Sequence, residues 1–158
     1  MTDWHDVDSL DTYELLIDEW LARFATDNPV IAAVDRAAPG DNERRWFVRM
    51  TGDEKDFITV WLTLGQRTLK YETYFMPAPE ENAVELFEHL LRRNDRLVGA
   101  HFSVGLENAI YLRGELPIAA LNAEEFDRVV GSMYVYVEQC FPTAIRIGFA
   151  SRFGSSTP

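Results

Sequence analysis

The sequence predicts an α+β fold in which three helices pack on one antiparallel sheet, in the order α-β(3-4)-α-ββ-α. Apolar and polar residues alternate across residues 45–50, 58–64 and 69–75, a pattern typical of an antiparallel sheet with one face on the core. Three further segments repeat apolar residues at helical spacing. With 158 residues, 47% of them hydrophobic, the chain suits one domain over residues 1–150, and we expect residues 151–158 to form a flexible tail.

The composition and charge of the chain argue against several classes of protein. Cys140 is the only cysteine, so one chain holds neither a disulfide framework nor a zinc site built from cysteines. The formal net charge is −11 and the 15 basic residues are scattered, which disfavours binding to nucleic acid or to an anionic membrane. No run approaches the roughly 18 apolar residues that span a bilayer. Because the acidic start also lacks a secretory signal pattern, we expect a soluble, cytoplasmic protein.

The first helix is predicted over residues 11–26, where six apolar side chains form one wide stripe. They are Tyr13, Leu16, Ile17, Trp20, Leu21 and Phe24. Asp11 followed by Glu14 resembles a capping box, although Asp8 or Ser9 are alternative caps. Pro29 ends the helix.

Four extended segments follow the first helix. Residues 30–34 are either an edge strand or a covered extended segment, and residues 38–42 form a loop. In the next three segments one set of alternate residues faces the core: Trp46, Val48 and Met50, then Ile58, Val60, Leu62 and Leu64, then Leu69, Tyr71, Thr73 and Phe75. Gly52 and Gly65 mark the turns between them.

The second helix is predicted to begin at Pro79, which suits a first helical turn, with Glu80 and Glu81 near the positive end of the helix dipole. Its expected buried stripe consists of Ala83, Val84, Phe87, Leu90 and Leu91. Asn94 is expected to adopt the left-handed conformation at the C-terminal end.

A second hairpin and a last helix complete the predicted fold. Apolar positions on the hairpin strands are Val98, Ala100, Phe102 and Val104, then Ile110, Leu112 and Leu116. Asn122 and Glu125 form a capping box at the start of the last helix. Its expected buried face consists of Phe126, Val129, Val130, Met133, Val137 and Phe141. Gly131 is interpreted as a point of close packing on a neighbour, and Pro142 as a kink or an end of the helix.

Three segments resemble a known family. Residues 90–94 (LLRRN), 99–103 (GAHFS) and 110–117 (IYLRGELP) resemble the actinobacterial YbjN-domain proteins, described as bacterial sensory transduction regulators. The element order is similar to that of the class I type III secretion chaperones, over nearly the whole chain. The extra strand at residues 30–34 and the proline at position 142 depart from that plan. The resemblance implies an acidic, cytoplasmic homodimer that binds partners, with no catalytic residues and no cofactor to carry over.

The residues themselves also lack recognisable catalytic or metal-binding patterns. His5, His89 and His101 do not have the spacing of metal ligands. Cys140, close to the end of a helix, is interpreted as a small core residue rather than a catalytic thiol. Adjacent carboxylates stand at helix starts or in a turn, where local electrostatics explains them. We therefore expect no enzyme activity and no bound metal, although a site assembled from separate loops would escape this search.

The candidate binding surface lies on the sheet face opposite the predicted core. Phe47, Trp61 and Tyr74 stand there, and Arg113 on the outer side of the second hairpin adds a polar contact. Their polar neighbours are Arg45, Thr59, Thr63, Lys70 and Glu115. Large aromatic residues on such a face are either covered by another element or form an interface. One interpretation is cover by a helix or by a second copy of the chain. The other is a groove for a protein partner, bound by strand addition or by apolar anchors.

The leading functional hypothesis is a non-enzymatic protein-binding module, chaperone-like or regulatory, that presents this hydrophobic surface to a protein partner. The alternative is a regulator that senses a small molecule in a pocket between the sheet and the last helix, lined by Phe102, Met133 and Tyr134. An enzyme would instead require a cleft that contains a desolvated carboxylate or histidine.

Overall fold

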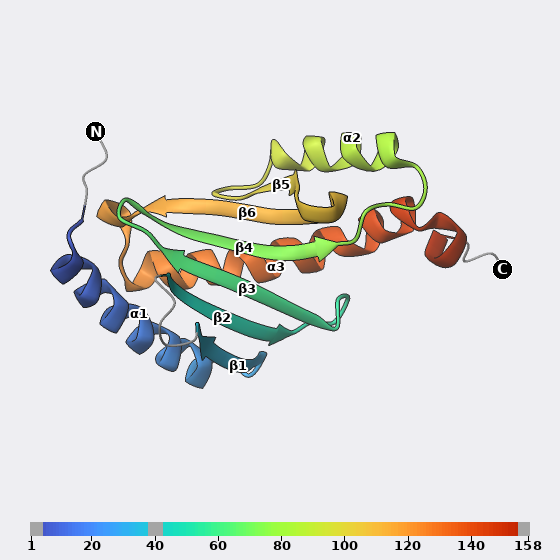
Figure 1. Ribbon diagram of the computed structural model, residues 1–158. Coiled ribbons are helices and arrows are strands. Elements are labelled where there is room, and N and C mark those ends of the chain that lie inside the picture. Colours follow the sequence, from blue (N-terminus) through green and yellow to red (C-terminus); the bar gives the residue numbers. More distant parts are fainter. Residues whose placement is uncertain (1–4, 38–42, 155–158) are drawn as a thin grey trace.

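The computed structural model describes residues 5–37 and 43–154 of the chain (Figure 1). The elements are α1 (Val7–Asp27), β1 (Ile31–Arg36), β2 (Arg44–Thr51), β3 (Phe57–Leu64), β4 (Thr68–Met76), α2 (Ala83–Asn94), β5 (His101–Val104), β6 (Ile110–Pro117) and α3 (Ala123–Gly148). This order confirms the predicted α+β class, with four strands before α2. The predicted loop at residues 38–42 lies outside the described residues.

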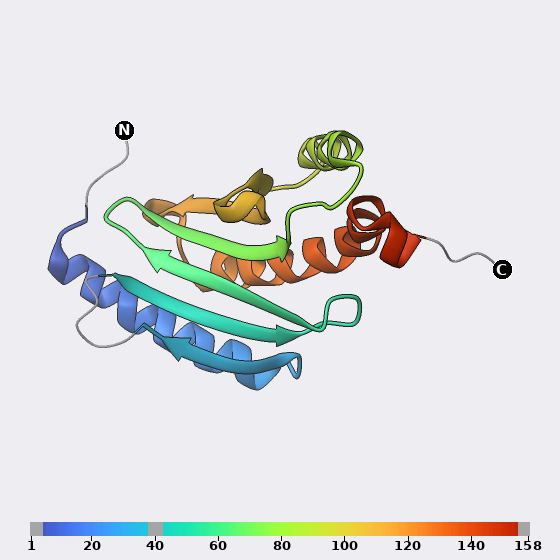
Figure 2. The same cartoon turned by 45° about the vertical axis from the view of Figure 1, so that its right-hand side comes forward.

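The strands form one sheet of six, in the order β1-β2-β3-β4-β6-β5, and every pairing is antiparallel. Helices α1 and α3 lie on the same face of the sheet, and α2 packs against α3 and β5 at one end (Figures 1 and 2). Helix α2 therefore sits at the rim of the molecule. The opposite face of the sheet carries no helix of the described chain.

The two-residue period of β2, β3 and β4 sorts their side chains as predicted. Trp46 and Ile58 are both completely buried on the face that meets α1 and α3. One continuous core extends from Leu10 in α1 to Phe149 after α3. The indole Nε1 of Trp46 donates a hydrogen bond to Asp18 Oδ1 at 2.7 Å, so the buried indole has a partner for its N–H group.

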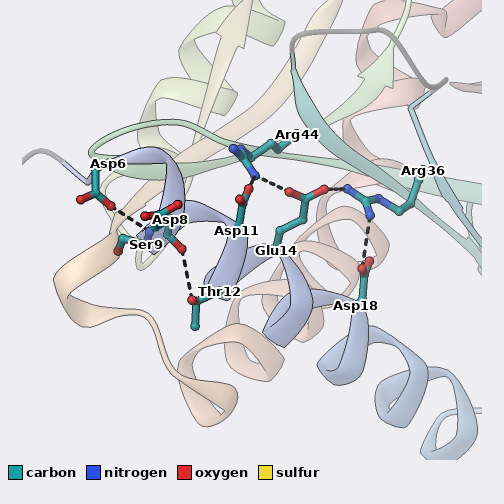
Figure 3. A network of polar contacts seen from close by, with 9 residues as sticks. All are labelled: Asp6, Asp8, Ser9, Asp11, Thr12, Glu14, Asp18, Arg36 and Arg44. Carbon is teal, nitrogen blue, oxygen red and sulfur yellow. Dashed lines mark hydrogen bonds and ion pairs between the residues drawn. The ribbon is translucent and has the colours of Figure 1, made fainter.

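Helix α1 begins four residues earlier than the sequence pattern predicted. The Asp6 carboxylate accepts a hydrogen bond from the Ser9 N–H at 2.9 Å and caps the helix. Asp11 and Glu14, which the pattern assigned to a capping box, instead bind the guanidinium of Arg44 in β2 (Figure 3). The two carboxylates therefore hold α1 against the sheet.

Strand β1 is an edge strand, one of the two alternatives for residues 30–34, and it continues to Arg36. Arg36 binds Glu14 and, at 3.2 Å, Asp18 (Figure 3). Its guanidinium also lies 5.0 Å from the centre of the Trp46 ring. These contacts tie the edge of the sheet to α1.

Helix α2 departs from the prediction at both ends and in its buried face. It begins at Ala83 after Asn82, which adopts a left-handed conformation (φ 53°), so Pro79 lies before the helix rather than in its first turn. Leu86 and Leu90 are buried, whereas the expected core residues Val84 and Leu91 are 82% and 67% exposed. The physical reason is the position of α2 at the rim, where α3 and β5 cover only a narrow stripe of it.

The end of α2 also differs from the prediction. Asn94 remains within the helix rather than adopting a left-handed conformation, and Asp95 in the right-handed region is the C-cap. In the hairpin that follows, Phe102 is buried, whereas Val104 is 51% exposed at the end of the short edge strand β5, and Val98 is 67% exposed in the bend before that strand.

Helix α3 begins as predicted, since the Asn122 side chain accepts a hydrogen bond from the Glu125 N–H at 2.9 Å. It continues through Pro142 to Gly148, so the proline does not end the helix. Apart from adjacent residues and the nearby backbone of α3 itself, no atom lies within 4 Å of a Cβ placed on Gly131, and the predicted close packing on a neighbour is therefore wrong.

The chain after α3 turns once more before the described residues end. Ala150–Gly154 form a π-helical turn, and Arg152 makes an ion pair with Glu80 at 2.9 Å. The Ser151 N–H donates to the Glu81 carboxylate at 3.1 Å. The first part of the expected tail is thus bound to the segment that precedes α2, and residues 155–158 lie outside the described residues.

Candidate functional site

The predicted surface residues lie together on the sheet face that α1 and α3 leave open. The strand register places Phe47 opposite Trp61, Trp61 opposite Glu72, and Glu72 opposite Arg113. These four residues form one line across β2, β3, β4 and β6, which we call the outer row. Directly opposed side chains on one sheet face interact, so the register brings together residues far apart in the sequence.

The outer row consists of an aromatic half and a charged half. The rings of Phe47 and Trp61 meet edge to face, with centroids 6.4 Å apart. The Arg113 Nε donates to Glu72 Oε2 at 2.8 Å, and its Nη1 donates to the Ser103 hydroxyl at 3.1 Å. Both side chains of the ion pair are about one third exposed, so solvent screens their attraction.

Tyr74 lies on the same face but outside the outer row. Its ring meets that of Tyr111 at right angles, with centroids 5.7 Å apart. Arg113 connects the two groups, because its guanidinium carbon lies 4.4 Å from the Tyr111 ring centre. Burial raises the pKa of the Tyr74 hydroxyl, with Tyr111 adding to the shift, so this group is a neutral hydrogen-bond donor at pH 7.

A shallow groove of about 450 Å³ runs along the charged half of the outer row. Its lining is mixed in charge: Glu43, Arg45, Trp61, Thr63, Lys70, Tyr71, Glu72, His101, Arg113, Gly114 and Glu115. Arg45 is paired with Glu43 at 2.6 Å, and its Nε donates to the Thr63 hydroxyl at 3.0 Å. An aromatic wall beside paired charges suits the apolar centre and polar rim of a protein interface.

Sequence reasoning missed two members of this surface, Glu72 and Tyr111. Alternation alone placed Glu72 beside Tyr74 on the outer face, and Tyr111 between two core positions. What the pattern did not contain was the register between β4 and β6, which pairs Glu72 with Arg113 and Tyr74 with Tyr111. Those pairings join segments about forty residues apart.

The pocket expected for a small-molecule sensor is not assembled from the predicted residues. Met133 is 1% exposed and belongs to the core. The Tyr134 hydroxyl donates to the Thr51 carbonyl at 3.2 Å. Phe102 lines a groove of about 280 Å³ between α2 and the β5–β6 hairpin, and neither Met133 nor Tyr134 takes part in it.

The groups with possible catalytic or metal-binding chemistry lie apart. The described residues contain no group of three or more His, Cys, Asp or Glu side chains able to hold a metal ion. Cys140 is buried, and burial raises the pKa of its thiol, which disfavours the reactive thiolate. His5 contacts the Ser9 hydroxyl at 3.1 Å, whereas His101 is exposed. No helix within the described part of the chain is long and apolar enough to cross a membrane.

Comparison with protein families identifies the relatives of this chain. Residues 18–146 match the YbjN family model, described as "Putative bacterial sensory transduction regulator". The chain belongs to the YbjN family. Its relatives include the uncharacterized protein Rv0487 of Mycobacterium tuberculosis, 32% identical over 113 residues, which are 72% of this chain and 62% of the relative. The uncharacterized protein ML2442 of Mycobacterium leprae is 30% identical over 111 residues, 70% of this chain and 60% of the relative.

This YbjN chain therefore spans about three fifths of the length of the curated relatives it matches. Among solved structures, it is similar to a chain of the ExoU–SpcU complex of the type III secretion system of Pseudomonas aeruginosa. That match has a TM-score of 0.53 and 14% identity, and covers 80% of this chain and 95% of that one. A chain of the ExsC–ExsE complex matches with a TM-score of 0.55 and 18% identity, over 81% of this chain and 95% of that one. The shared fold confirms the predicted architecture of this YbjN protein.

Proposed function

We propose that this YbjN protein is a non-enzymatic, cytoplasmic protein-binding module, chaperone-like or regulatory, whose outer sheet face receives a protein partner. The observation that carries the proposal is the Phe47–Trp61 pair, with Tyr74 nearby, on a face that no described helix covers. The family description as a sensory transduction regulator supports a regulatory role. The similar structures are chains of complexes, ExoU with SpcU and ExsC with ExsE.

The position of the outer row favours binding through side chains rather than by strand addition. Its residues stand on β2, β3, β4 and β6, which all have a strand on each side, so their backbone groups are already paired. A partner at this surface would bury aromatic area around Trp61 and place polar groups along the Glu72–Arg113 pair. The net charge of −11 disfavours an acidic partner and favours one that is basic or largely apolar.

A matched pair of variants tests this proposal. Trp61→Glu places a charge at the centre of the outer row, whereas Leu15→Glu changes a residue of α1 that is 71% exposed and lies away from this face. Affinity capture from the native cytoplasm should yield a partner with the wild type and with Leu15→Glu, and lose that same partner with Trp61→Glu. Circular dichroism checks that both variants are folded. Equal capture by the two variants, or unfolding of Trp61→Glu alone, would contradict the proposal.

We further propose that the protein is a homodimer and that the two copies meet at α2 and β5 rather than at the outer row. The groove there is lined mostly by apolar side chains: Phe87, Leu90, Leu91, Asn94, Phe102, Ser103, Val104 and Ile110. Leu91 in its lining is exposed, and so is Val84, one heptad earlier on α2. A second α2 packed on this stripe would remove both side chains from water.

Two polar features of this region support helix packing. The Asn94 side chain accepts a hydrogen bond from the Phe102 N–H at 2.6 Å and donates to the Phe102 carbonyl at 3.2 Å, which closes the edge of β5 to a further strand. Glu85 stands in the first turn of α2 and Arg92 in its last. In an antiparallel pair of α2 helices, these opposite charges would face one another.

Light scattering on purified protein tests the dimer separately from the partner surface. The wild type and Trp61→Glu should both be dimers, and Leu91→Glu should be a folded monomer because the new charge lies in the interface. A wild type that is monomeric at micromolar concentration, or a Leu91→Glu variant that remains dimeric, would contradict this arrangement.

A further inference from the structure

The end of α2 concentrates positive charge in an acidic protein. His89, Arg92 and Arg93 lie in the last two turns of α2 at a spacing of three and four residues, and Arg96 follows two residues after the helix ends at Asn94. Together with Asp95 they line an open hollow of about 520 Å³. The chain as a whole has 26 acidic and 15 basic residues, so three arginines within five positions stand out against the surrounding charge.

Most of the positive charge in this hollow lacks a carboxylate partner. Arg92 is paired with Glu88 one turn earlier, at 2.9 Å. No ion pair joins Arg93 or Arg96 to a carboxylate of the described residues. The Arg96 backbone N–H donates to the Arg93 carbonyl at 2.9 Å and turns the chain back after α2, and both side chains line the hollow.

His89 supplies an independent observation at the same place. Its Nε2 is buried and has no hydrogen-bond partner. Among the described residues it is the one buried side-chain nitrogen or oxygen atom without a partner. Burial and then the charge of Arg93 lower the pKa of this imidazole, and Glu85 opposes them. The charge of Arg93 also opposes the burial that raises the pKa of the Cys140 thiol in α3.

We propose that this hollow binds a phosphate-type oxyanion, held by the guanidinium groups of Arg93 and Arg96. A guanidinium group presents two N–H donors in a plane that matches two oxygens of a phosphate group. The helix dipole explains arginines in the last turn of α2, but not Arg96, which lies beyond the helix. The anion is either free phosphate or a phosphorylated side chain of a protein. The site lies on α2, and so it is independent of the outer row.

Nuclear magnetic resonance of the full chain, titrated with inorganic phosphate, tests the proposal. The ring signals of His89 are identified by comparison with His89→Gln. The signals should shift along a saturating curve, and the pKa of His89 should rise on binding, because a bound anion offsets the charge of Arg93. Arg93→Gln combined with Arg96→Gln should weaken binding by about tenfold or more, as expected when charge-assisted hydrogen bonds are lost. Arg146→Gln, an exposed arginine in the last turn of α3, should leave binding unchanged.

Two comparisons make the result decisive. If sodium chloride at matched ionic strength reproduces the shift, or if the curve does not saturate, the effect is screening and the site is refuted. If the double variant unfolds, Arg96→Gln alone is used in its place, because Arg96 is exposed and lies outside the helix.

The peptide Gly-phosphoserine-Gly and its unphosphorylated form then distinguish the two sources of the anion. Tighter binding of the phosphopeptide than of phosphate indicates a modified protein segment, and equal binding indicates the free anion.

Discussion

The carboxylate of Glu138 occupies the space that a side chain at Gly52 would require. Glu138 lies in the middle of α3, and its oxygens accept hydrogen bonds from the N–H groups of Asp53 at 3.1 Å, Glu54 at 2.8 Å and Lys55 at 3.4 Å. The turn between β2 and β3 is thus fastened to a helix more than eighty residues away. Gly52 is required because a Cβ there would collide with the Lys55 carbonyl oxygen, a backbone atom, as well as with the Glu138 carboxylate.

Replacing Glu138 by alanine should therefore destabilise the protein. The change leaves three backbone N–H groups of the turn without their acceptor, and we expect a loss of about 1–3 kcal/mol in the free energy of unfolding. Gln139→Ala, the exposed neighbour on the same helix, is the control and should change stability by less than about 0.5 kcal/mol. Urea denaturation measures both. Equal stability of the two variants would show that the turn does not depend on Glu138.

The Glu72–Arg113 pair should contribute little to stability despite its good geometry. Both side chains are about one third exposed, so the coupling energy from a double-mutant cycle of Glu72→Ala and Arg113→Ala should be about 1 kcal/mol or less. Partner binding through the outer row should be affected by the same variants more than folding is. A coupling energy well above 2 kcal/mol would mean that the pair is a structural element rather than part of a binding surface.

Acid should weaken the fold through His89. The pKa of this imidazole is lowered in the folded protein by burial and by Arg93, so the unfolded chain binds its proton more readily. Stability should then fall as the pH decreases below the ordinary value of 6.5, and level off below the folded pKa. Urea midpoints measured between pH 7.5 and pH 5, in steps of about half a unit, check this dependence. The His89→Gln variant should lose that part of the pH dependence of stability. If the variant keeps the full pH dependence of the wild type, other groups cause it and the prediction is wrong.

Two leucines, Leu86 on α2 and Leu15 on α1, test whether α2 packs into the core through Leu86. Leu86 is completely buried, so Leu86→Ala should cost about 2–5 kcal/mol in unfolding free energy. Leu15→Ala removes the same atoms from a site on α1 that is 71% exposed, and should cost less than about 0.5 kcal/mol. If the two variants lose similar stability, α2 does not pack on α3 through Leu86.

The sequence was sufficient for the element order and for the sheet, because the two-residue rhythm of β2, β3 and β4 admits one division into faces. It was insufficient for α2. Val84, Leu86, Phe87, Leu90 and Leu91 offer two overlapping apolar stripes, and only the position of α3 decides between them. Spacing within one helix does not contain that information.

The helix caps and the candidate site were likewise predictable only where the local sequence decides the structure. At the last helix, Asn122 and Glu125 were identified correctly because a single capping box precedes the apolar face. At α1, several acidic residues compete, and Asp6 became the cap while Asp11 turned towards Arg44. In the candidate site, alternation placed Phe47 and Trp61 on one face, but the pairing of distant strands supplied their charged neighbours.

The insertion of β6 between β4 and β5 has a consequence for synthesis of the chain on the ribosome. Strand β4 is complete at Met76, yet its open side is paired only when β6 emerges, more than thirty residues later. A nascent chain halted in that interval presents unpaired backbone donors and acceptors beside the exposed rings of a half-built sheet. While residues 76–110 are being synthesised, the nascent chain is therefore prone to aggregate with other chains.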